Sequence, residues 1–117
     1  MTPKEIAEAA VKALDSKLGE NICLIATTKV TVVSDYFVIV NGNSNTHVKA
    51  LADEVEYALS QQGVEPNHVE GKATGWILLD YGCVVVHVFT PDAREYYNLE
   101  KLWADGEVVD ISSLTED

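Results

Sequence analysis

The stretch that decides the fold is Trp76-Ile77-Leu78-Leu79-Asp80-Tyr81-Gly82-Cys83-Val84-Val85-Val86-His87-Val88-Phe89. Two apolar runs, rich in branched and aromatic residues, meet at its central Asp-Tyr-Gly, a pattern typical of two strands joined by a tight turn. Side chains alternate along a strand, so Trp76, Leu78 and Asp80 share one face, while Ile77, Leu79 and Tyr81 share the other. Neither face is polar. Each therefore needs a cover, either from the chain's own helices or from another protein.

A helix is expected directly after this hairpin, within the segment that ends at Trp103. The hydroxyl of Thr90 can cap it, and Pro91 suits the first helical position, where its missing N–H costs nothing. Segment 76–103 also contains both tryptophans, three of the five tyrosines and the only arginine. Such residues are enriched in the energetic centres of protein interfaces, although each of them has an equally simple interpretation as core.

Length and composition predict one domain spanning residues 1–117, with an acidic C-terminal tail from about residue 104. No apolar run approaches the roughly 20 residues of a membrane span. The chain starts without a secretory leader, and Cys23 and Cys83 lie in apolar runs, which favours a reduced, cytoplasmic compartment. The net charge of −11 opposes direct binding to nucleic acid and favours a basic protein partner, or else serves solubility alone.

The remaining elements follow from periodicity and capping. Thr2-Pro3-Lys4-Glu5 is a capping box for a helix that Gly19 ends, and a second amphipathic helix is expected over residues 46–62. Residues 22–27 and 36–40 are expected to be strands, with an ambiguous connection between them, and a short strand is expected before Glu70-Gly71. This order predicts an α/β (α+β) fold, a mixed β-sheet of about five strands with helices packed on it.

Catalytic chemistry finds little support in the sequence. The loop from Gly42 to Ser44, together with Asp80, would suit a nucleotidyltransferase, but its two metal ions need adjacent carboxylates and the strand offers only Asp80. An ordinary helix cap is favoured for that loop. The three histidines lack metal-ligand spacing; His87 is expected to be a core residue with a satisfied ring, while His47 fits either a cap or a surface contact. We expect no catalytic residue, cofactor or metal.

The sequence resembles the ribosomal silencing factor family, bacterial proteins related to plant iojap. The resemblance covers nearly the whole chain and rests on the order and spacing of several stretches: Ser34-Asp35-Tyr36-Phe37-Val38-Ile39, Asn43-Ser44, His47-Val48, Ala52-Asp53, Glu70-Gly71, Trp76, Leu79-Asp80-Tyr81-Gly82, Val85-Val86-His87-Val88-Phe89, Arg94, Tyr97, Leu99-Glu100 and Leu102-Trp103. One departure is Cys83, where the family usually carries an acidic residue.

The resemblance implies a nucleotidyltransferase-like fold without the catalytic carboxylates, and a protein that is not an enzyme. It further implies binding to large-subunit ribosomal protein fourteen, a basic β-barrel, which sterically blocks joining of the small subunit and represses translation when nutrients are short. The free protein is expected to be a homodimer. An adaptor for another basic protein and the nucleotidyltransferase remain as alternatives.

By the same resemblance, the ribosomal contact is expected on the hairpin and on the helix after it. These partner-binding residues are Trp76, Leu78, Asp80, Tyr81, Arg94, Tyr97, Glu100 and Trp103. Asp80 and Glu100 would face cationic side chains, and Trp76 or Trp103 would fill an apolar pocket.

Overall fold

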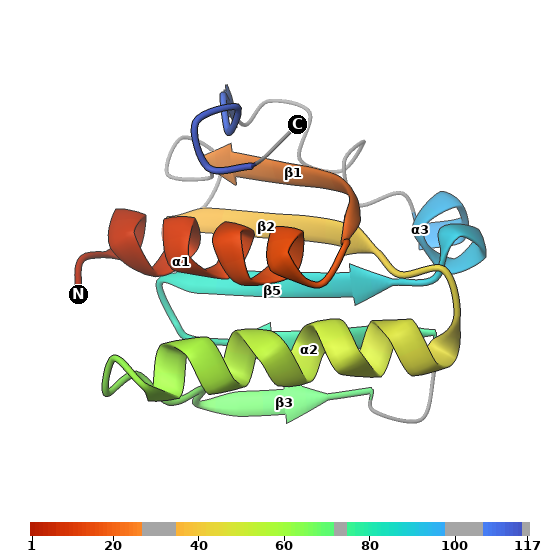
Figure 1. Ribbon diagram of the computed structural model, residues 1–117, viewed down its shortest axis with the longest axis horizontal. Coiled ribbons are helices and arrows are strands. Elements are labelled where there is room, and N and C mark those ends of the chain that lie inside the picture. The colour runs from red at the N-terminus through yellow and green to blue at the C-terminus, as the bar shows by residue number, and fades with distance from the viewer. Residues whose placement is uncertain (27–34, 72–74, 98–106, 116–117) are drawn as a thin grey trace.

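The computed structural model describes residues 1–26, 35–71, 75–97 and 107–115 (Figure 1). The elements along the chain are α1 (Pro3–Ser16), β1 (Glu20–Ala26), β2 (Tyr36–Asn41), α2 (Asn45–Ser60), β3 (His68–Glu70), β4 (Trp76–Asp80), β5 (Val84–Phe89), α3 (Pro91–Tyr97) and β6 (Glu107–Val109). The mixed α/β order and the hairpin expected from the sequence are confirmed. The ambiguous connection over residues 29–34 lies outside the described residues.

The strands form one sheet in the order β3-β4-β5-β2-β1-β6. β2 and β5 run parallel, whereas the other neighbouring pairs are antiparallel. The sheet thus has six strands rather than about five. The additional strand lies in what the sequence suggested was only an acidic tail. There Val109 pairs with Leu24 and Val108 pairs with Ile25, so that the outer edge of β1 is not left open.

One face of the sheet, called here the helix face, is covered by α1 and α2, which run side by side in opposite directions (Figure 1). The fully buried strand residues beneath them are aliphatic: Val38, Val40, Ile77, Leu79, Val84, Val86 and Val88. The helices contribute a matching stripe that includes Val11, Leu14, Leu51, Val55 and Leu59. No helix among the described residues is long and apolar enough to cross a membrane.

Both long helices begin with the caps that the sequence indicated. Thr2 and Glu5 form the complete capping box of α1, and the Ser44 hydroxyl accepts the His47 backbone N–H at the start of α2. Between β2 and α2 the backbone passes so close to the helix that a Cβ on Gly42 would lie 2.8 Å from the backbone nitrogen of Val48. The loop from Gly42 to Ser44 is therefore a helix cap, as favoured from the sequence.

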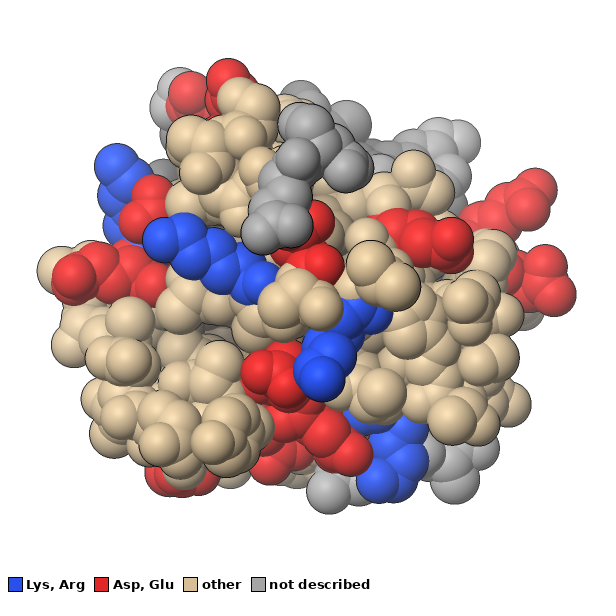
Figure 2. Space-filling view, viewed as in Figure 1, with Lys and Arg blue, Asp and Glu red and all other residues tan. Residues whose placement is uncertain are grey.

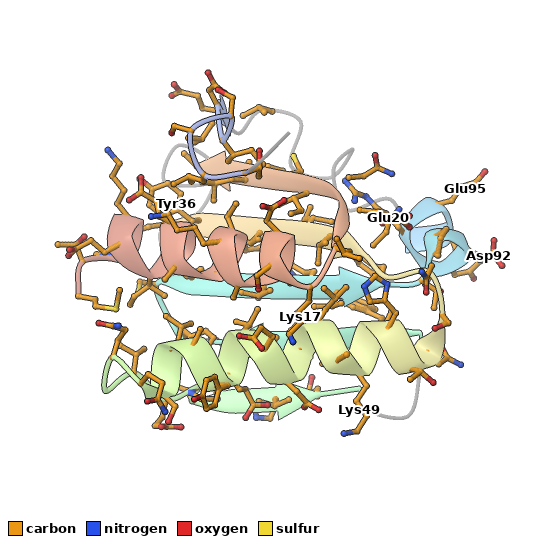
Figure 3. All side chains as sticks on the ribbon, in the orientation of Figure 1. Lys17, Glu20, Tyr36, Lys49, Asp92 and Glu95 are labelled. Carbon is orange, nitrogen blue, oxygen red and sulfur yellow. The ribbon has the colours of Figure 1, made fainter. Side chains whose placement is uncertain are left out.

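His47 joins the ends of the two covering helices. Its Nδ1 accepts the Asn43 backbone N–H at 2.9 Å, so the ring proton sits on Nε2, which donates to the Lys17 carbonyl at 2.8 Å. Of the two roles left open for His47, the structure supports the capping one. Lys17 also reaches from the end of α1 toward α2, where its Nζ lies 3.9 Å from Glu54 (Figure 3).

The opposite side of the sheet, called here the aromatic face, has a cluster of its own. Ile25, Phe37, Ile39 and Phe89 are buried there, and Cys23, Trp76, Val85 and Ala93 pack against them. Of the described helices, only the short α3 contributes to this cluster, through Ala93. Cys23 and Cys83 do not form a disulfide. The two faces of one sheet thus carry different kinds of side chain.

Candidate interaction surface

The hairpin strand β4 divides its side chains between the two faces as alternation requires. Ile77 and Leu79 are 1% and 0% exposed beneath the helices. Trp76, Leu78 and Asp80 point to the aromatic face and are only half-buried. Their neighbours across the ladder are Phe89, His87 and Val85 of β5. The prediction that these three hairpin residues share one face is therefore confirmed, and that face remains partly open to solvent.

Trp76 is fixed in orientation by two ring contacts. Its indole Nε1–H donates to Nδ1 of His87 at 3.2 Å, and its ring stacks on Phe89 with centroids 5.2 Å apart and planes at 28°. His87 in turn lies 5.0 Å, ring to ring, from Phe37. A hydrogen bond combined with stacking leaves the indole few alternative rotamers. Trp76 is thus a half-exposed but rigidly placed aromatic side chain.

His87 is the buried polar residue beneath this surface. It is 4% exposed, and burial lowers its pKa to about 4, so the ring is neutral at physiological pH. Because Nδ1 accepts the Trp76 N–H, the ring proton sits on Nε2, which finds no hydrogen-bond partner in the described part of the chain. The sequence indicated a core histidine with a satisfied ring. The core position is confirmed, but within the described ranges only one of its two ring nitrogens has a hydrogen-bond partner.

A hollow of about 230 Å³ opens beside Trp76 and is lined by Glu70, Gly71, Trp76 and Leu78. Glu70 stands opposite Leu78 in the antiparallel β3/β4 ladder, so both side chains project from the same face. The Glu70 carboxylate also pairs with the His68 ring at 2.7 Å. In the sequence, Glu70 marked the end of an expected short strand and was part of the family resemblance, but it was not among the predicted contact residues. Its place beside Leu78 follows from the β3/β4 register, which a strand of only three residues does not reveal in the sequence.

Asp80 ends β4 and shapes the turn. Its Oδ1 accepts the backbone N–H of Gly82 at 2.7 Å, and Gly82 adopts φ +82°, a left-handed conformation that suits glycine. The carboxylate is half-buried and remains on the aromatic face. Asp80 therefore has a local structural role as well as any role in binding.

Tyr81, the next residue, belongs to the other side of the sheet. It is 7% exposed within the helix-covered core, and its hydroxyl has no hydrogen-bond partner among the described residues. Burial, together with the nearby carboxylates of Glu56 and Glu65, raises the pKa of this phenol well above its usual value. The structure does not bring Tyr81 together with Trp76, Leu78 and Asp80.

Arg94 connects α3 to the end of the sheet. Its Nη1 donates to the Asn21 carbonyl at 2.6 Å and to Oδ1 of Asn41 at 3.0 Å, which ties the helix to the strands on which these residues lie. Asp92 and Glu95, on the same short helix, point away from the body of the protein (Figure 3). Tyr97 is the last described residue of α3, and the predicted contacts Glu100 and Trp103 lie outside the described residues.

Comparison with known families identifies the kind of protein that carries this surface. A family model described as ribosomal silencing factor during starvation matches residues 1–117. The chain belongs to this family. This confirms the resemblance on which the expected contact residues were based.

Individual relatives agree with this assignment over most of their length. A ribosomal silencing factor of Halalkalibacterium halodurans is 39% identical over 115 residues, which cover 97% of this chain and 98% of the relative. The corresponding protein of Bacillus subtilis is 41% identical over 112 residues and 95% of each chain. The chain is also 34% identical over 98 residues to a mitochondrial iojap-related protein of Arabidopsis thaliana, and these residues cover 53% of that protein.

Solved structures show the same architecture. A crystal structure of a Chromobacterium violaceum protein superposes with a TM-score of 0.86 at 39% identity, and covers 89% of this chain and 88% of the other. One from Bacillus halodurans superposes with a TM-score of 0.81 at 40% identity, over 92% and 98% of the two chains. The silencing-factor fold, one sheet of six strands with helices packed on it, is thereby shown for this chain.

The rival nucleotidyltransferase site is not assembled in this silencing-factor chain. Gly42 follows the end of β2 and donates its N–H to the Phe89 carbonyl, whereas Asp80 pairs with Val85 near the start of β5. The loop and the carboxylate thus stand at opposite ends of the strands. Within the described residues, no cluster of three histidine, cysteine, aspartate or glutamate side chains is placed to hold a metal ion.

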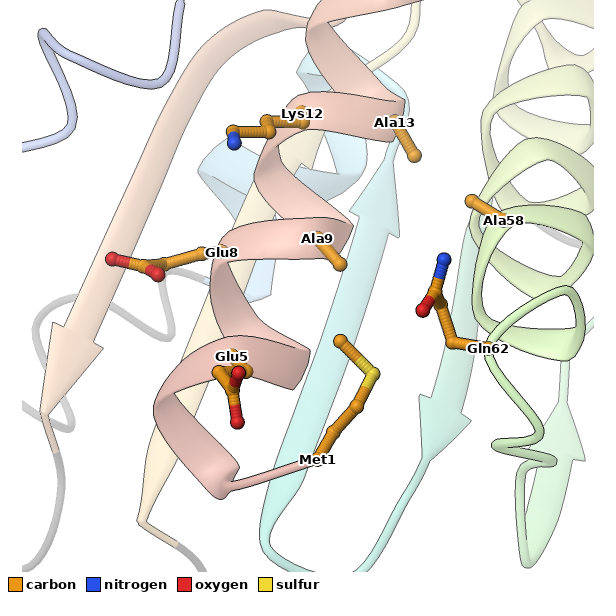
Figure 4. Close-up of a pocket in the computed structure, with 8 residues that line it drawn as sticks. All are labelled: Met1, Glu5, Glu8, Ala9, Lys12, Ala13, Ala58 and Gln62. Atoms are coloured by element: carbon orange, nitrogen blue, oxygen red, sulfur yellow. The ribbon is translucent and has the colours of Figure 1, made fainter.

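A second hollow, of about 450 Å³, lies on the helix side between α1 and α2 (Figure 4). Ala9 and Ala13 face Ala58 across it, Met1 lies at its end, and its remaining lining residues are the polar or charged Glu5, Glu8, Lys12 and Gln62. Acidic and basic side chains are interspersed over this side of the molecule (Figure 2). The aromatic face, with its rigid tryptophan and adjacent carboxylate, is the stronger candidate for an interaction surface.

Proposed function

We propose that this protein silences the ribosome by binding the large subunit through large-subunit ribosomal protein fourteen, a basic β-barrel, and so sterically blocking association with the small subunit. Membership of the ribosomal silencing factor family supports ribosome association and translation regulation. The mechanism requires no turnover, because a bound domain occupies space that the small subunit needs. It would repress translation when nutrients are limited.

The observation that supports the proposal best is the half-exposed apolar surface of Trp76 and Leu78 beside the acidic Glu70. Rigid aromatic anchors next to a hollow are typical of the energetic centres of interfaces. The chain carries a net charge of −11, which would speed encounter with a basic ribosomal protein, while apolar contacts hold the complex. Charge and shape therefore favour the same class of partner.

The predicted contact residues take different parts in this proposal. We place Trp76, Leu78 and Asp80 at the centre of the contact, because they share the partly open face. Arg94 fixes α3 beside that face, and Tyr81 supports the hairpin from the core. Tyr97, Glu100 and Trp103 stay predictions. We further propose that the free protein is a cytoplasmic homodimer, which sedimentation equilibrium of the purified chain would test.

Co-sedimentation with purified large ribosomal subunits tests the proposal. The Leu78→Glu variant places a charge in the centre of the proposed contact, and Tyr57→Glu provides the matched control, because Tyr57 is 62% exposed on the helix side. Asp80→Asn removes the negative charge while keeping a side-chain oxygen for the Gly82 N–H. Small subunits are added afterwards to measure joining.

We expect the wild type and Tyr57→Glu to travel with the large subunit and to keep small subunits from joining. Leu78→Glu should lose both properties, and Asp80→Asn should bind several-fold more weakly. Wild-type protein that stays at the top of the gradient at low salt would contradict the proposed partner. Binding that survives Leu78→Glu would instead show that the contact lies elsewhere on the molecule.

A further inference from the structure

We propose that the hollow lined by Glu70, Gly71, Trp76 and Leu78 is a subsite for one lysine side chain of the basic partner. This inference rests on the proposed function, since it specifies the chemistry that the partner presents to the aromatic face. It assigns a role to Glu70, which lies on the edge strand β3 and was not among the expected contact residues.

The size of the hollow suits a single side chain. Its volume of about 230 Å³ is below the range of roughly 300 to 1,000 Å³ that is usual for small-molecule and cofactor sites. Leu78 and Trp76 form apolar walls from β4, and Glu70 stands opposite Leu78 at the end of β3. Gly71, which has φ +81°, contributes backbone alone to the lining. Among the residues that the structure describes, the hollow thus combines two apolar walls with the carboxylate of Glu70.

The tryptophan wall is formed before any partner arrives. The indole is held by its hydrogen bond to His87 and by stacking on Phe89, as described above. A wall that is already ordered spares the complex the entropy of fixing a large side chain on binding. It also keeps the ring in one orientation toward the hollow. The subsite is therefore specific in shape as well as in charge.

The walls match the two parts of a lysine side chain. Its methylene stem can lie along Leu78 and the indole, and its ammonium can meet the Glu70 carboxylate and the electron-rich ring of Trp76. An acidic side chain would be repelled by Glu70 and by the overall charge of −11. A purely apolar side chain would cover the Glu70 carboxylate without offering it a charged or hydrogen-bonding partner.

Lysine is favoured over arginine by the state of the carboxylate. Oε1 of Glu70 lies 2.7 Å from Nε2 of His68, so one of its two oxygens is already engaged. A guanidinium binds carboxylates best through both oxygens at once, whereas an ammonium needs only one acceptor. The remaining oxygen, Oε2, therefore suits a lysine.

Zero-length carbodiimide coupling of the wild-type protein bound to purified large subunits tests the contact directly. The reagent joins a carboxylate to an amine that touches it, and peptide mass spectrometry then locates the new amide bond. We expect Glu70 to be joined to a lysine of a ribosomal protein. Coupling of Glu70 only to a lysine of a second copy of this chain would overturn the proposal, because the occupant would then belong to a homodimer.

Affinity measurements with the same subunits provide the second readout. Glu70→Gln keeps the size of the side chain and removes its charge, and we expect it to bind about tenfold more weakly or worse. Glu65→Gln is the matched control: it removes the same charge from an exposed residue near Tyr81, on the helix side, and should change the affinity less than about twofold. Thermal unfolding of both variants should match that of the wild type.

The outcomes separate the subsite from the proposed function. If the wild type binds, Leu78→Glu does not, and Glu70→Gln binds like the wild type without any coupling at Glu70, the lysine subsite is wrong and the ribosomal function stands. Equal losses of affinity in Glu70→Gln and Glu65→Gln would show that Glu70 acts only through the overall charge of the protein. That result would also overturn the subsite. If the wild type itself fails to bind large subunits, both proposals fail together.

Discussion

The two faces of the sheet differ in the kinds of side chain they carry and in how far those side chains are buried. On the helix face, every fully buried strand residue is aliphatic, and two long helices complete the core. On the aromatic face, the rings of Phe37, Trp76, His87 and Phe89 contact one another, and residues at the edge remain half-exposed. One ring nitrogen there has no hydrogen-bond partner among the described residues. Aliphatic packing maximises stability, whereas aromatic and polar groups orient a surface.

The comparison teaches that hydrophobicity alone does not identify a core. Leu78 and Leu79 are neighbours of the same type on one strand, yet Leu79 is 0% exposed and Leu78 lines an open hollow. Stability and recognition are thus assigned to alternate positions of a single hairpin strand. Substitutions that act on one face and spare the other provide the direct tests of this division.

The largest effect is expected from truncating the covered leucine. Leu79→Ala should lower the free energy of unfolding by about 3 kcal/mol, because it leaves a cavity beneath the helices. Leu78→Ala removes the same atoms from a half-open position and should cost less than about 1 kcal/mol. Urea unfolding measures both variants. Equal losses would show that the aromatic face is as much a part of the core as the helix face.

Acid should weaken the aromatic face specifically, through His87. The folded state holds this ring neutral, with its pKa at about 4 against 6.5 for an ordinary histidine. The unfolded chain therefore binds more protons between these values, so the contribution is complete above pH 6.5 and is lost as the pH falls toward 4. From pH 7.5 to pH 5.0, His87 alone should cost about 2 kcal/mol of unfolding free energy.

Two histidine variants isolate this effect from the carboxylates that also titrate in acid. His87→Gln has no ring to protonate, so its unfolding free energy should fall by about 2 kcal/mol less than that of the wild type over the same interval. His68→Gln, which makes the same substitution at an exposed position on β3 outside the buried aromatic cluster, is the matched control. Parallel pH profiles for all three proteins would contradict the assignment to His87.

A smaller effect is expected at the junction of the covering helices. His47→Ala removes the hydrogen bonds to the Asn43 N–H and to the Lys17 carbonyl, and should lower the free energy of unfolding by about 1 to 2 kcal/mol. His68→Ala is the control and should change it by less than about 0.5 kcal/mol. Chemical unfolding of the purified variants gives both values. A neutral His47→Ala would mean that the helices hold their places through apolar packing alone.

Local signals were sufficient to predict most elements of the fold. The capping box at Thr2, the cap at Ser44 and the Asp-Tyr-Gly turn each involve residues close in sequence, and each is present in the structure. β6 was missed, because two valines in an acidic tail carry no signal until β1 is there to pair with them. Pairing between distant segments depends on tertiary context, which propensity does not contain.

The candidate site was only partly predictable for the same reason. Alternation along β4 placed Trp76, Leu78 and Asp80 together, and the structure confirms that they share a face. Glu70 enters the site through the β3/β4 register, which a three-residue strand does not reveal in the sequence. Arg94 appeared to be an interface residue by its type, but its contacts with Asn21 and Asn41 give it a role in holding α3.

Tyr81 offers the finest test of the division between faces, because its ring lies in the helix-covered core while its neighbour Asp80 points to the other side. Its buried hydroxyl lacks a hydrogen-bond partner among the described residues, so Tyr81→Phe removes an unsatisfied polar group at little cost in packing. Stability should stay unchanged or rise by up to about 1 kcal/mol, and binding to large subunits should stay within about twofold of the wild type. Thermal unfolding and co-sedimentation measure the two properties separately. A loss of binding with stability intact would move Tyr81 to the contact surface, and a loss of stability would reveal a partner for its hydroxyl.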